Sequence, residues 1–443
     1  MNETVDVVVV GAGVAGLAAA AALRRSGVGT LVVEAAGRVG GRAHTVRLAG
    51  GDAFDRGASW LHDAQRNPLV GIARAAGEAP VEADSVWRRR LFVGRRRATA
   101  DEEAAYAASC ERYAAAAEAA ARGAADIDMA SAVSALRDEA WTATVETWQT
   151  TLIAAADPRD FSARDWHANA LAGTNMRLPG GVGDFVVRRL APLAGPVRLK
   201  TPVARIRWGD AAGVAVQTAR GTLAARAVIV TVSTGVLGAG DIAFEPALPL
   251  SYQEAIAGLP IGLLMKVALP ATGADRLGLP ATCSLRRRAE GMLAPSMSFL
   301  AWPYGAAHIV GFIGGPAAAA LSREGPAAVE AFARAQLSDL LGHGADAALG
   351  AGVVADWARD PLHRGAYAYA KPGHAGARAA LGTPLGGGRL VFAGEACRTD
   401  GLAGTVGGAW LDGERAGAVV AGLLRPPAPR HSRDAKREGD ERC

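Results

Sequence analysis

Three glycines near the N-terminus have the spacing of a loop that binds a dinucleotide. Gly11, Gly13 and Gly16 directly follow the β-branched run Val5–Val10, and Glu34 ends the next apolar run. Gly11 permits a tight turn, Gly13 lets a pyrophosphate approach the backbone, and Gly16 lets the following helix pack on the strand. The helix N-terminus supplies amide donors, and Glu34 reaches a ribose hydroxyl. This order predicts a strand–helix–strand unit that binds a dinucleotide.

A second glycine pair distinguishes between the two common dinucleotides, because NAD and FAD both use the first motif. Gly40 and Gly41 give the backbone another close approach to a diphosphate, and Arg42 adds a fork-shaped cation for the phosphates. The segment Glu34–Arg42 resembles the FAD-binding segment of the flavin-dependent amine oxidases. The resemblance implies that the cofactor is FAD.

The resemblance covers residues 5–424 in sequence order. Asp55–His62, followed by Asn67–Leu69, looks like the polyamine-oxidase branch of the family. Further motifs follow in the family's order: Arg177–Gly181, Pro202–Ile206, Ala227–Leu237, Phe244–Pro246, Trp357, Arg364–Tyr369, Phe392–Ala396 and Gly404–Ala409. The implied fold is α/β, with a discontinuous Rossmann-type FAD-binding domain and an inserted α+β substrate domain.

The motifs of the first domain lie at the start, in the middle and at the end of the chain, so this domain must be discontinuous. We assign residues 1–84, 177–259 and 386–424 to the FAD-binding domain. The substrate-binding domain is then formed by residues 85–176 and 260–385. Prolines and charged residues predict a disordered tail over residues 425–443.

Four segments of the substrate domain have a predictable local structure. Asp101–Gly123 and Met129–Ala155 are predicted to be helices, and His308–Ile313 is predicted to be a strand. Two arginine runs, Arg88–Arg90 and Arg95–Arg97, are predicted to be solvated arms of a hairpin. A patch that binds phosphate or membrane is the alternative for these runs.

Lys266 stands in the apolar, strand-like run Leu263–Ala268, in a chain whose basic residues are almost all arginine. A buried lysine can lose its proton because desolvation lowers its pKa from about 10.4, and arginine cannot do this. In the family that this chain resembles, the matching lysine holds a water against flavin N5, which implies the same role here. A strand lysine that extends its amine to solvent is the structural alternative.

The resemblance implies three further residues at the site of reaction. Tyr367 matches the aromatic residue that stands over the flavin face. Thr405 stands where many members have a second aromatic wall, and Thr occurs there in spermine and acetylpolyamine oxidases and in histone-lysine demethylases. Gly407 departs from those branches, which usually carry His. His62 resembles the active-site His of the polyamine branch, and a supporting hydrogen-bond role is its alternative.

A helix predicted from Thr405 would direct its N-terminal amides toward flavin N1. The family's cysteinyl linkage to flavin falls at Ala366, so we expect non-covalent FAD. The expected FAD-binding residues are Gly11, Gly13, Ala15, Gly16, Glu34, Arg42, Gly57, Ala58, Ser59, Val203, Gly394, Glu395, Thr405 and Val406. Among them, Glu395 resembles the residue that contacts the ribityl–diphosphate region.

Composition excludes several classes of protein. The 443 residues are 50% hydrophobic and 21% charged, which excludes a disordered chain. The net charge of +5 is spread thinly, so we expect no nucleic-acid partner. Four cysteines lie far apart without metal-binding spacing, which predicts no metal site and a reducing compartment. The apolar stretch Val7–Leu23 lacks a basic region before it and carries glycines, so we expect a cytoplasmic protein without a membrane partner.

The resemblance implies an FAD-dependent amine oxidase. Hydride would pass from the α-carbon of a neutral amine to flavin N5, the imine would hydrolyse, and O2 would reoxidise the flavin to give H2O2. The motifs favour a polyamine-like or secondary amine, which needs acidic groups along its path; the candidates are Asp63, Glu78, Glu82 and Asp84. An L-amino-acid oxidase, which needs a buried arginine, and a flavin-binding protein without amine turnover remain alternatives. The oligomeric state is left open.

Overall fold

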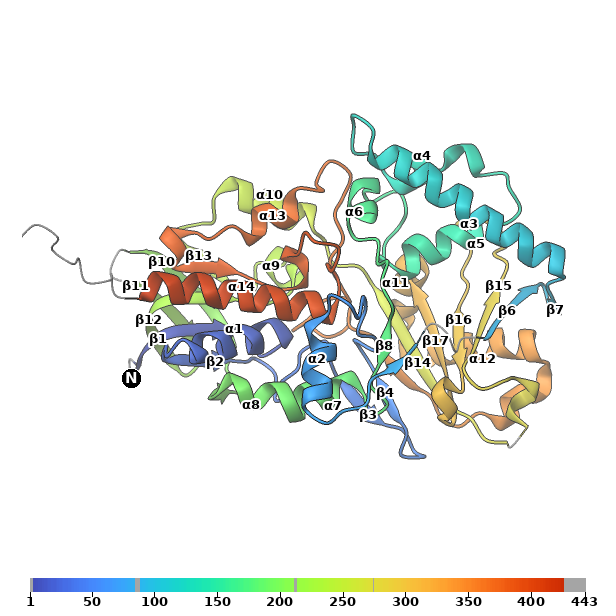
Figure 1. The fold of residues 1–443 in the computed structure, drawn as a ribbon, viewed down its shortest axis with the longest axis horizontal. Helices are drawn as coiled ribbons and strands as arrows, with labels where there is room; N and C mark the ends of the chain where they lie inside the picture. Colours follow the sequence, from blue (N-terminus) through green and yellow to red (C-terminus); the bar gives the residue numbers. More distant parts are fainter. Residues whose placement is uncertain (1–2, 84–87, 211–212, 274, 426–443) are drawn as a thin grey trace, which may run out of the picture.

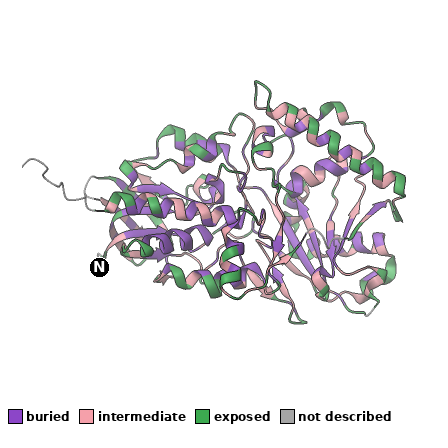
Figure 2. Cartoon of the chain, viewed as in Figure 1, coloured by how far each residue is buried: buried purple, intermediate pink, exposed green. Residues whose placement is uncertain are grey.

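The computed structural model describes residues 3–83, 88–210, 213–273 and 275–425. The predicted tail lies outside these residues except for Arg425. Figure 1 shows two sheets side by side, each with helices packed against it. Buried residues line the strands and the inner faces of the helices, and the outer helix faces are exposed (Figure 2).

The larger sheet has the strand order β13-β10-β11-β12-β1-β2-β9, and β19 pairs with β12. Strand β1 runs parallel to both β2 and β12, and its residues Val7–Val10 are almost fully buried. This confirms the predicted strand–helix–strand unit. The strands are β1 (Glu3–Val10), β2 (Thr30–Val33), β9 (Val197–Arg198), β10 (Val203–Asp210), β11 (Gly213–Thr218), β12 (Gly221–Val230), β13 (Ala243–Glu245) and β19 (Leu390–Phe392).

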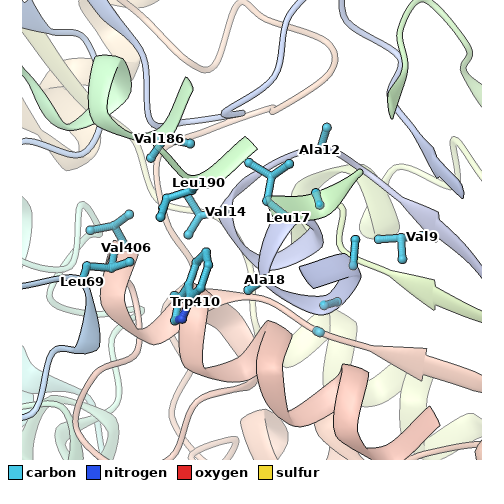
Figure 3. Close-up of a cluster of buried hydrophobic side chains, with 14 of the residues drawn as sticks. Val9, Ala12, Val14, Leu17, Ala18, Leu69, Val186, Leu190, Val406 and Trp410 are labelled. Atoms are coloured by element: carbon cyan, nitrogen blue, oxygen red, sulfur yellow. The ribbon is translucent and has the colours of Figure 1, made fainter. Parts of the chain in front are cut away.

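Helices α1 (Val14–Arg25) and α14 (Val406–Leu424) pack against each other on one face of this sheet. Their backbones approach closely because α14 presents glycine to α1. A Cβ at Gly413 would lie 2.1 Å from the carbonyl oxygen of Ala15. In Figure 3, Trp410 of α14 lies in the same apolar cluster as Val14 and Leu17 of α1. This packing brings the N-termini of both helices to the same end of the sheet (Figure 1).

The smaller sheet has the strand order β18-β14-β17-β16-β15-β6-β7. Its strands are β6 (Arg88–Val93), β7 (Arg96–Arg97), β14 (Leu264–Pro270), β15 (Cys283–Arg287), β16 (Ser298–Ala301), β17 (His308–Gly314) and β18 (Val353–Ala355). Strands β6 and β7 pair antiparallel, which confirms the hairpin predicted from the two arginine runs. Strand β17 confirms the predicted strand His308–Ile313.

The predicted helix Asp101–Gly123 is confirmed by α3 (Ala100–Ala121). The single predicted helix Met129–Ala155 is wrong, because four short segments replace it: α4 (Met129–Ala132), η1 (Ser134–Leu136), α5 (Thr142–Glu146) and the π-helix η2 (Thr147–Leu152). The hydroxyls of Thr147, Thr150 and Thr151 donate to carbonyl oxygens four residues earlier. Such side-chain bonds and β-branching disfavour a regular helix.

The remaining elements connect the two sheets or cover them. The helices are α2 (Pro68–Ala75), α6 (Ala163–Ala168), α7 (Val182–Phe185), α8 (Ala191–Ala194), α9 (Thr234–Gly238), α10 (Leu250–Gly258), α11 (Gly315–Glu324), α12 (Pro326–Leu341) and α13 (Ala377–Gly382). Two short hairpins pair β3 (Thr45–Arg47) with β4 (Ala53–Asp55) and β5 (Val81–Glu82) with β8 (Met176–Arg177). The other short helical segments are η3 (Val186–Leu190), η4 (Arg276–Gly278), η5 (Pro303–Gly305), η6 (His343–Ala348), η7 (Gly386–Gly388) and η8 (Glu395–Cys397).

The division into two domains stays a prediction. All strands of the larger sheet come from residues 1–84, 177–259 and 386–424, and those of the smaller sheet come from the other two segments. However, Ala368, Ala370 and helix α13 pack in the core of the larger sheet. We therefore propose that the third segment of the FAD-binding domain begins before residue 386.

The close contact between α1 and α14 can be tested with a glycine pair on one helix. Gly413→Ala should lower the free energy of unfolding by about 1–3 kcal/mol, because its Cβ would meet the backbone of α1. Gly422→Ala is the matched control: a Cβ there meets nothing within 4 Å, and alanine favours the helix. Thermal unfolding of both variants measures the difference. Equal midpoints would contradict the close approach.

Candidate active site

The glycine loop between β1 and α1 leaves space next to backbone amides that no N-cap side chain binds. Gly11 has a φ of +104°, which favours glycine, and a Cβ at Gly16 would lie 1.9 Å from the carbonyl oxygen of Gly11. A Cβ at Gly13 would meet nothing within 4 Å. Gly13 is also the N-cap of α1 and supplies no side-chain cap, so the first amides of α1 are open to a ligand. The loop therefore fits an approaching diphosphate.

Glu34 lies directly after β2, beside this loop. Its Oε2 accepts a hydrogen bond of 2.6 Å from the amide of Ala12, and its Oε1 accepts one of 2.8 Å from the amide of Ala36. The amide of Thr201 donates to the carbonyl oxygen of Glu34, which brings the start of β10 at Val203 close to it. A carboxylate oxygen has more than one lone pair, so Glu34 retains acceptor capacity for a sugar hydroxyl.

Arg42 and Glu395 form an ion pair, although the sequence predicts a separate flavin contact for each. The Nη1 atom of Arg42 lies 2.9 Å from Oε1 of Glu395 and donates to the carbonyl oxygen of Ala366 at 2.7 Å. The backbone amide of Gly394 donates to Asp412 of α14 at 2.9 Å. The pair therefore connects the second glycine segment to the start of η8, and both flavin contacts stay predictions.

The loop Gly57–Ser59 packs directly on the segment of Arg42. A Cβ at Gly57 would lie 1.6 Å from the carbonyl oxygen of Arg42, so only glycine fits there. The amide of Ala58 donates to that same oxygen at 3.1 Å. Three segments that the sequence predicts to bind FAD are thus adjacent: the first glycine loop, the segment of Arg42 and this loop.

Lys266 extends from β14 of the smaller sheet to the loop that follows β4. It is 5% exposed. Its Nζ donates to the Oγ of Ser59 at 2.6 Å, to the carbonyl oxygen of Asp55 at 3.2 Å and to the carbonyl oxygen of Gly57. The Nζ atom also lies 5.7 Å from the ring centres of Trp60 and Phe312. The structural alternative of a lysine that reaches solvent is therefore wrong.

Burial lowers the pKa of Lys266 from its ordinary value of 10.5 to about 7. The Asp55 carboxylate opposes this effect, and the positive charge of Arg177 adds to it. Burial in turn raises the pKa of Asp55, whose carboxylate accepts from Thr45 and from the amides of Val182 and Gly183. Lys266 can therefore exchange a proton near neutral pH, which arginine could not do.

Tyr367 lies beside the start of α14. Its hydroxyl donates to the carbonyl oxygen of Leu152 at 2.6 Å, and burial raises its pKa, so the phenol stays neutral. A Cβ at Gly404 would lie 3.8 Å from the Tyr367 ring. Thr405 caps α14: its hydroxyl accepts from the amide of Gly408 and donates to the carbonyl oxygen of Leu402. Its contact with substrate stays a prediction.

His62 is held by Asn175, which the sequence analysis does not single out. The Nδ1 of His62 lies 2.7 Å from the Oδ1 of Asn175, and its ring stacks on Trp60 with ring centres 6.2 Å apart. At Gly407, a Cβ would lie 2.5 Å from the Nδ2 of Asn67. Asn67 thus fills the space that a His at position 407 would need.

A cavity of about 10 Å³ lies beside Lys266, large enough for one water molecule. Arg177, Trp60, His308 and Phe312 line it. The Nε atom of Arg177 is buried without a hydrogen-bond partner, and its guanidinium lies over the rings of Trp60 and Tyr304. The sequence analysis notes the motif that begins at Arg177 and assigns the residue no role, because only the fold brings it to Lys266.

Two of the four acidic candidates for a polyamine path are paired with arginine. Asp63 binds Arg66, and Glu78 binds Arg188 and Arg189. Glu82 is exposed on β5, and Asp84 lies outside the described residues. Within the described ranges, no helix is long and apolar enough to cross a membrane, and no three His, Cys, Asp or Glu side chains gather as metal ligands.

Comparison with known proteins identifies relatives along most of the chain. The family model of flavin containing amine oxidoreductases matches residues 14–421. Lysine-specific histone demethylase 1 homolog 1 of Arabidopsis thaliana is 30% identical over 465 residues, covering 96% of this chain and 53% of that protein. Polyamine oxidase 1 of Oryza sativa subsp. japonica is 31% identical, covering 59% of this chain and 61% of that protein.

The structural comparison agrees with the observed architecture. Putrescine oxidase bound to putrescine matches with a TM-score of 0.79 at 21% identity, covering 95% of this chain and 100% of that one. This likeness confirms the predicted fold class. The match to the first curated relatives spans only 53% to 61% of their length. Because the family model covers most of this chain, the chain belongs to the flavin-containing amine oxidoreductases, and its cofactor is FAD.

Proposed function

We propose that this chain oxidises a small amine by hydride transfer from the carbon next to the nitrogen, followed by imine hydrolysis and reoxidation by O2 to give H2O2. When bound, FAD supplies the hydride acceptor. The observation that carries the proposal is the position of Lys266. Its buried amine binds the loop Gly57–Ser59 and lies beside the rings of Trp60 and Phe312.

The glycine loop, Glu34 and the segment of Arg42 are the residues that would hold FAD. Supporting this, the loop has open space at Gly13, and Glu34 retains acceptor capacity. We propose that the contacts are non-covalent, because Ala366 stands at the position of the family's cysteinyl linkage. Cys397 is the nearest cysteine in sequence, and burial raises its thiol pKa well above the ordinary value. A thiol of this kind is a poor nucleophile.

The chain's own residues would bind the amine in its neutral form and exclude water. Tyr367, Trp60 and Phe312 present rings, and none of their hydroxyl or ring groups carries a charge at neutral pH. An unprotonated amine has the lone pair that drives hydride loss, and apolar walls disfavour its charged form. Lys266 would hold the loop through its Nζ atom and would release a proton near neutral pH. We propose that its Nζ atom also contacts a water at flavin N5.

A polyamine-like or secondary amine is our first candidate for the substrate. Support comes from the Asp55–His62 segment and from the matches to a polyamine oxidase and to putrescine oxidase. The acidic groups that a polycation needs are less well supplied, because arginines already neutralise Asp63 and Glu78.

A carboxylate-bearing amine, such as an L-amino acid, is the second candidate. Arg177 favours it, because its Nε is buried without a partner at the cavity beside Lys266. A guanidinium binds a carboxylate with two parallel hydrogen bonds, and a buried unpaired donor is costly.

An amine panel separates the two candidates. Peroxide release is measured with spermine, spermidine, an acetylated polyamine, an aryl-alkylamine and an L-amino acid, in the wild type and in Arg177→Met. If the substrate is a polyamine, kcat/KM should be highest for a polyamine. This kcat/KM should fall at higher salt if exposed charges bind the polyamine, because salt screens them. A kcat/KM about tenfold higher for the amino acid than for any polyamine corresponds to about 1.4 kcal/mol. If Arg177→Met abolishes this preference, the carboxylate-bearing amine replaces the polyamine as the substrate. If no amine releases peroxide, the chain is a flavin-binding protein without amine turnover.

Lys266→Met tests the role of the buried lysine. We expect FAD to remain bound and flavin reduction or reoxidation to slow by about a hundredfold to a thousandfold, because one positioned hydrogen-bonding group is lost. In the wild type, the rate of flavin reduction or reoxidation should rise with pH through the Lys266 pKa of about 7, as the Lys266 amine becomes neutral. This rise should be absent in the variant. Stopped-flow absorbance measures both half-reactions. Lys371→Met, an exposed lysine, is the control; equal rates in all three proteins would make Lys266 purely structural.

A further inference from the structure

The most buried ion pair among the described residues joins Asp165 of α6 to Arg378 of α13. Their side chains are 3% and 5% exposed. The Nε of Arg378 donates to Oδ1 of Asp165 at 2.7 Å, and its Nη2 donates to Oδ2 at 2.8 Å. Helix α6 packs with α3, whereas α13 packs in the core of the larger sheet. The pair therefore connects the helices above the smaller sheet to the domain expected to bind FAD.

The same two side chains also hold the backbone next to Tyr367. Arg378 Nη2 also donates to the carbonyl oxygen of Ala368 at 3.0 Å, and Nη1 donates to that of Ala396 at 3.2 Å. Asp165 Oδ2 accepts from the amide of Ala370 at 2.9 Å. One ion pair thus fixes the segment just after Tyr367 and the residue just after Glu395.

A second ion pair holds the same segment from its other end. Glu395 Oε1 accepts from the amide of Ala368 at 3.1 Å and from Arg42 Nη1 at 2.9 Å. Arg42 Nη1 also donates to the carbonyl oxygen of Ala366. The peptide groups on both sides of Tyr367 are therefore bound by a row of alternating charges: Arg42, Glu395, Arg378 and Asp165.

The charges of this row stabilise one another. Burial acts to lower the pKa of Arg378, but Asp165 and Glu395 more than offset it, so its pKa lies above the ordinary value. A buried ion pair is nevertheless weak support for stability, because an apolar pair of similar size is often as stable. Its distinct property is direction: the planar guanidinium of Arg378 donates to four oxygen atoms in one fixed geometry.

We propose that Asp165 and Arg378 form a positioning pair that fixes Tyr367 and Glu395 relative to the bound flavin and the amine. The inference rests on the proposed function. Neither residue touches the reacting atoms; the pair acts through the backbone of Ala368, Ala370 and Ala396. A lysine at position 378 keeps the charge but cannot form all these bonds at once, because it lacks the fork.

Three variants test the pair: Arg378→Lys, Asp165→Asn and the apolar double variant Asp165→Leu/Arg378→Met. The control is Arg334→Lys at a similar pair away from this site: Arg334 binds Glu330 and donates to the carbonyl oxygen of Gly350, and Glu330 accepts from the amide of Gly352. The readouts are the dissociation constant of FAD, the visible spectrum of the bound flavin, and the rate of its reduction by amine at saturating FAD.

We expect Arg378→Lys and the double variant to weaken FAD binding or to shift the flavin spectrum, and to slow reduction by about tenfold to a hundredfold, as misplaced reacting groups do. KM should change less than kcat, and Arg334→Lys should change none of these. Asp165→Asn keeps the shape of the side chain and one acceptor oxygen, so we expect a smaller effect on FAD binding and flavin reduction in the same direction. This variant is the test of the pair if the other two variants do not fold.

A folded double variant with wild-type FAD affinity, spectrum and reduction rate would overturn the positioning claim and leave a structural ion pair. The positioning claim is also overturned if Asp165→Asn changes FAD affinity, flavin spectrum and reduction rate no more than Arg334→Lys does. If no amine reduces the wild-type flavin, the proposed function fails instead, and FAD affinity and spectrum still decide whether the pair positions the site.

Discussion

The site depends on one contact between the two sheets, the hydrogen bonds from the Lys266 amine to the loop Asp55–Ser59. Lys266 belongs to a strand of the smaller sheet, whereas the loop packs on the segment of Arg42 beside the larger sheet. A charged amine in this buried place must have hydrogen-bond acceptors, and three oxygens of one loop supply them. The contact therefore fixes the distance between the strand that carries the lysine and the loop expected to hold flavin, whereas the burial of the amine lowers the pKa of Lys266.

Tyr367 is positioned by a different set of contacts. Its neighbours Ala366 and Ala368 are bound by Arg42, Glu395 and Arg378, and its hydroxyl reaches Leu152 at the end of the π-helix. Residues far apart in the sequence thus meet at one short segment. Different side-chain contacts hold the lysine and the tyrosine, but the backbone of Tyr367 also accepts from the amide of Gly262, just before the strand that carries Lys266.

The elements predicted well from the sequence are those with local causes. The β1–α1–β2 unit follows from β-branched residues and glycine spacing, and the helix at Thr405 follows from its own cap. The helix predicted over Met129–Ala155 is wrong because the chain leaves the helical path between α4 and α5, and the threonine hydroxyls bond back to the backbone only in the π-helix that follows. The pairing of Arg42 with Glu395, the approach of Arg177 to Lys266 and the Asp165–Arg378 pair join residues with no local signal, so only the fold brings them together.

We propose above all that an amine delivers its electrons to FAD in this chain. The most direct measurement is an anaerobic titration of the FAD-loaded protein with the best amine of the panel, followed by admission of O2. We expect one equivalent of amine to bleach the oxidised flavin absorbance, and O2 then to restore it with the release of one equivalent of H2O2. A flavin that stays oxidised with every amine, yet is bleached by a nicotinamide dinucleotide, would contradict the claim.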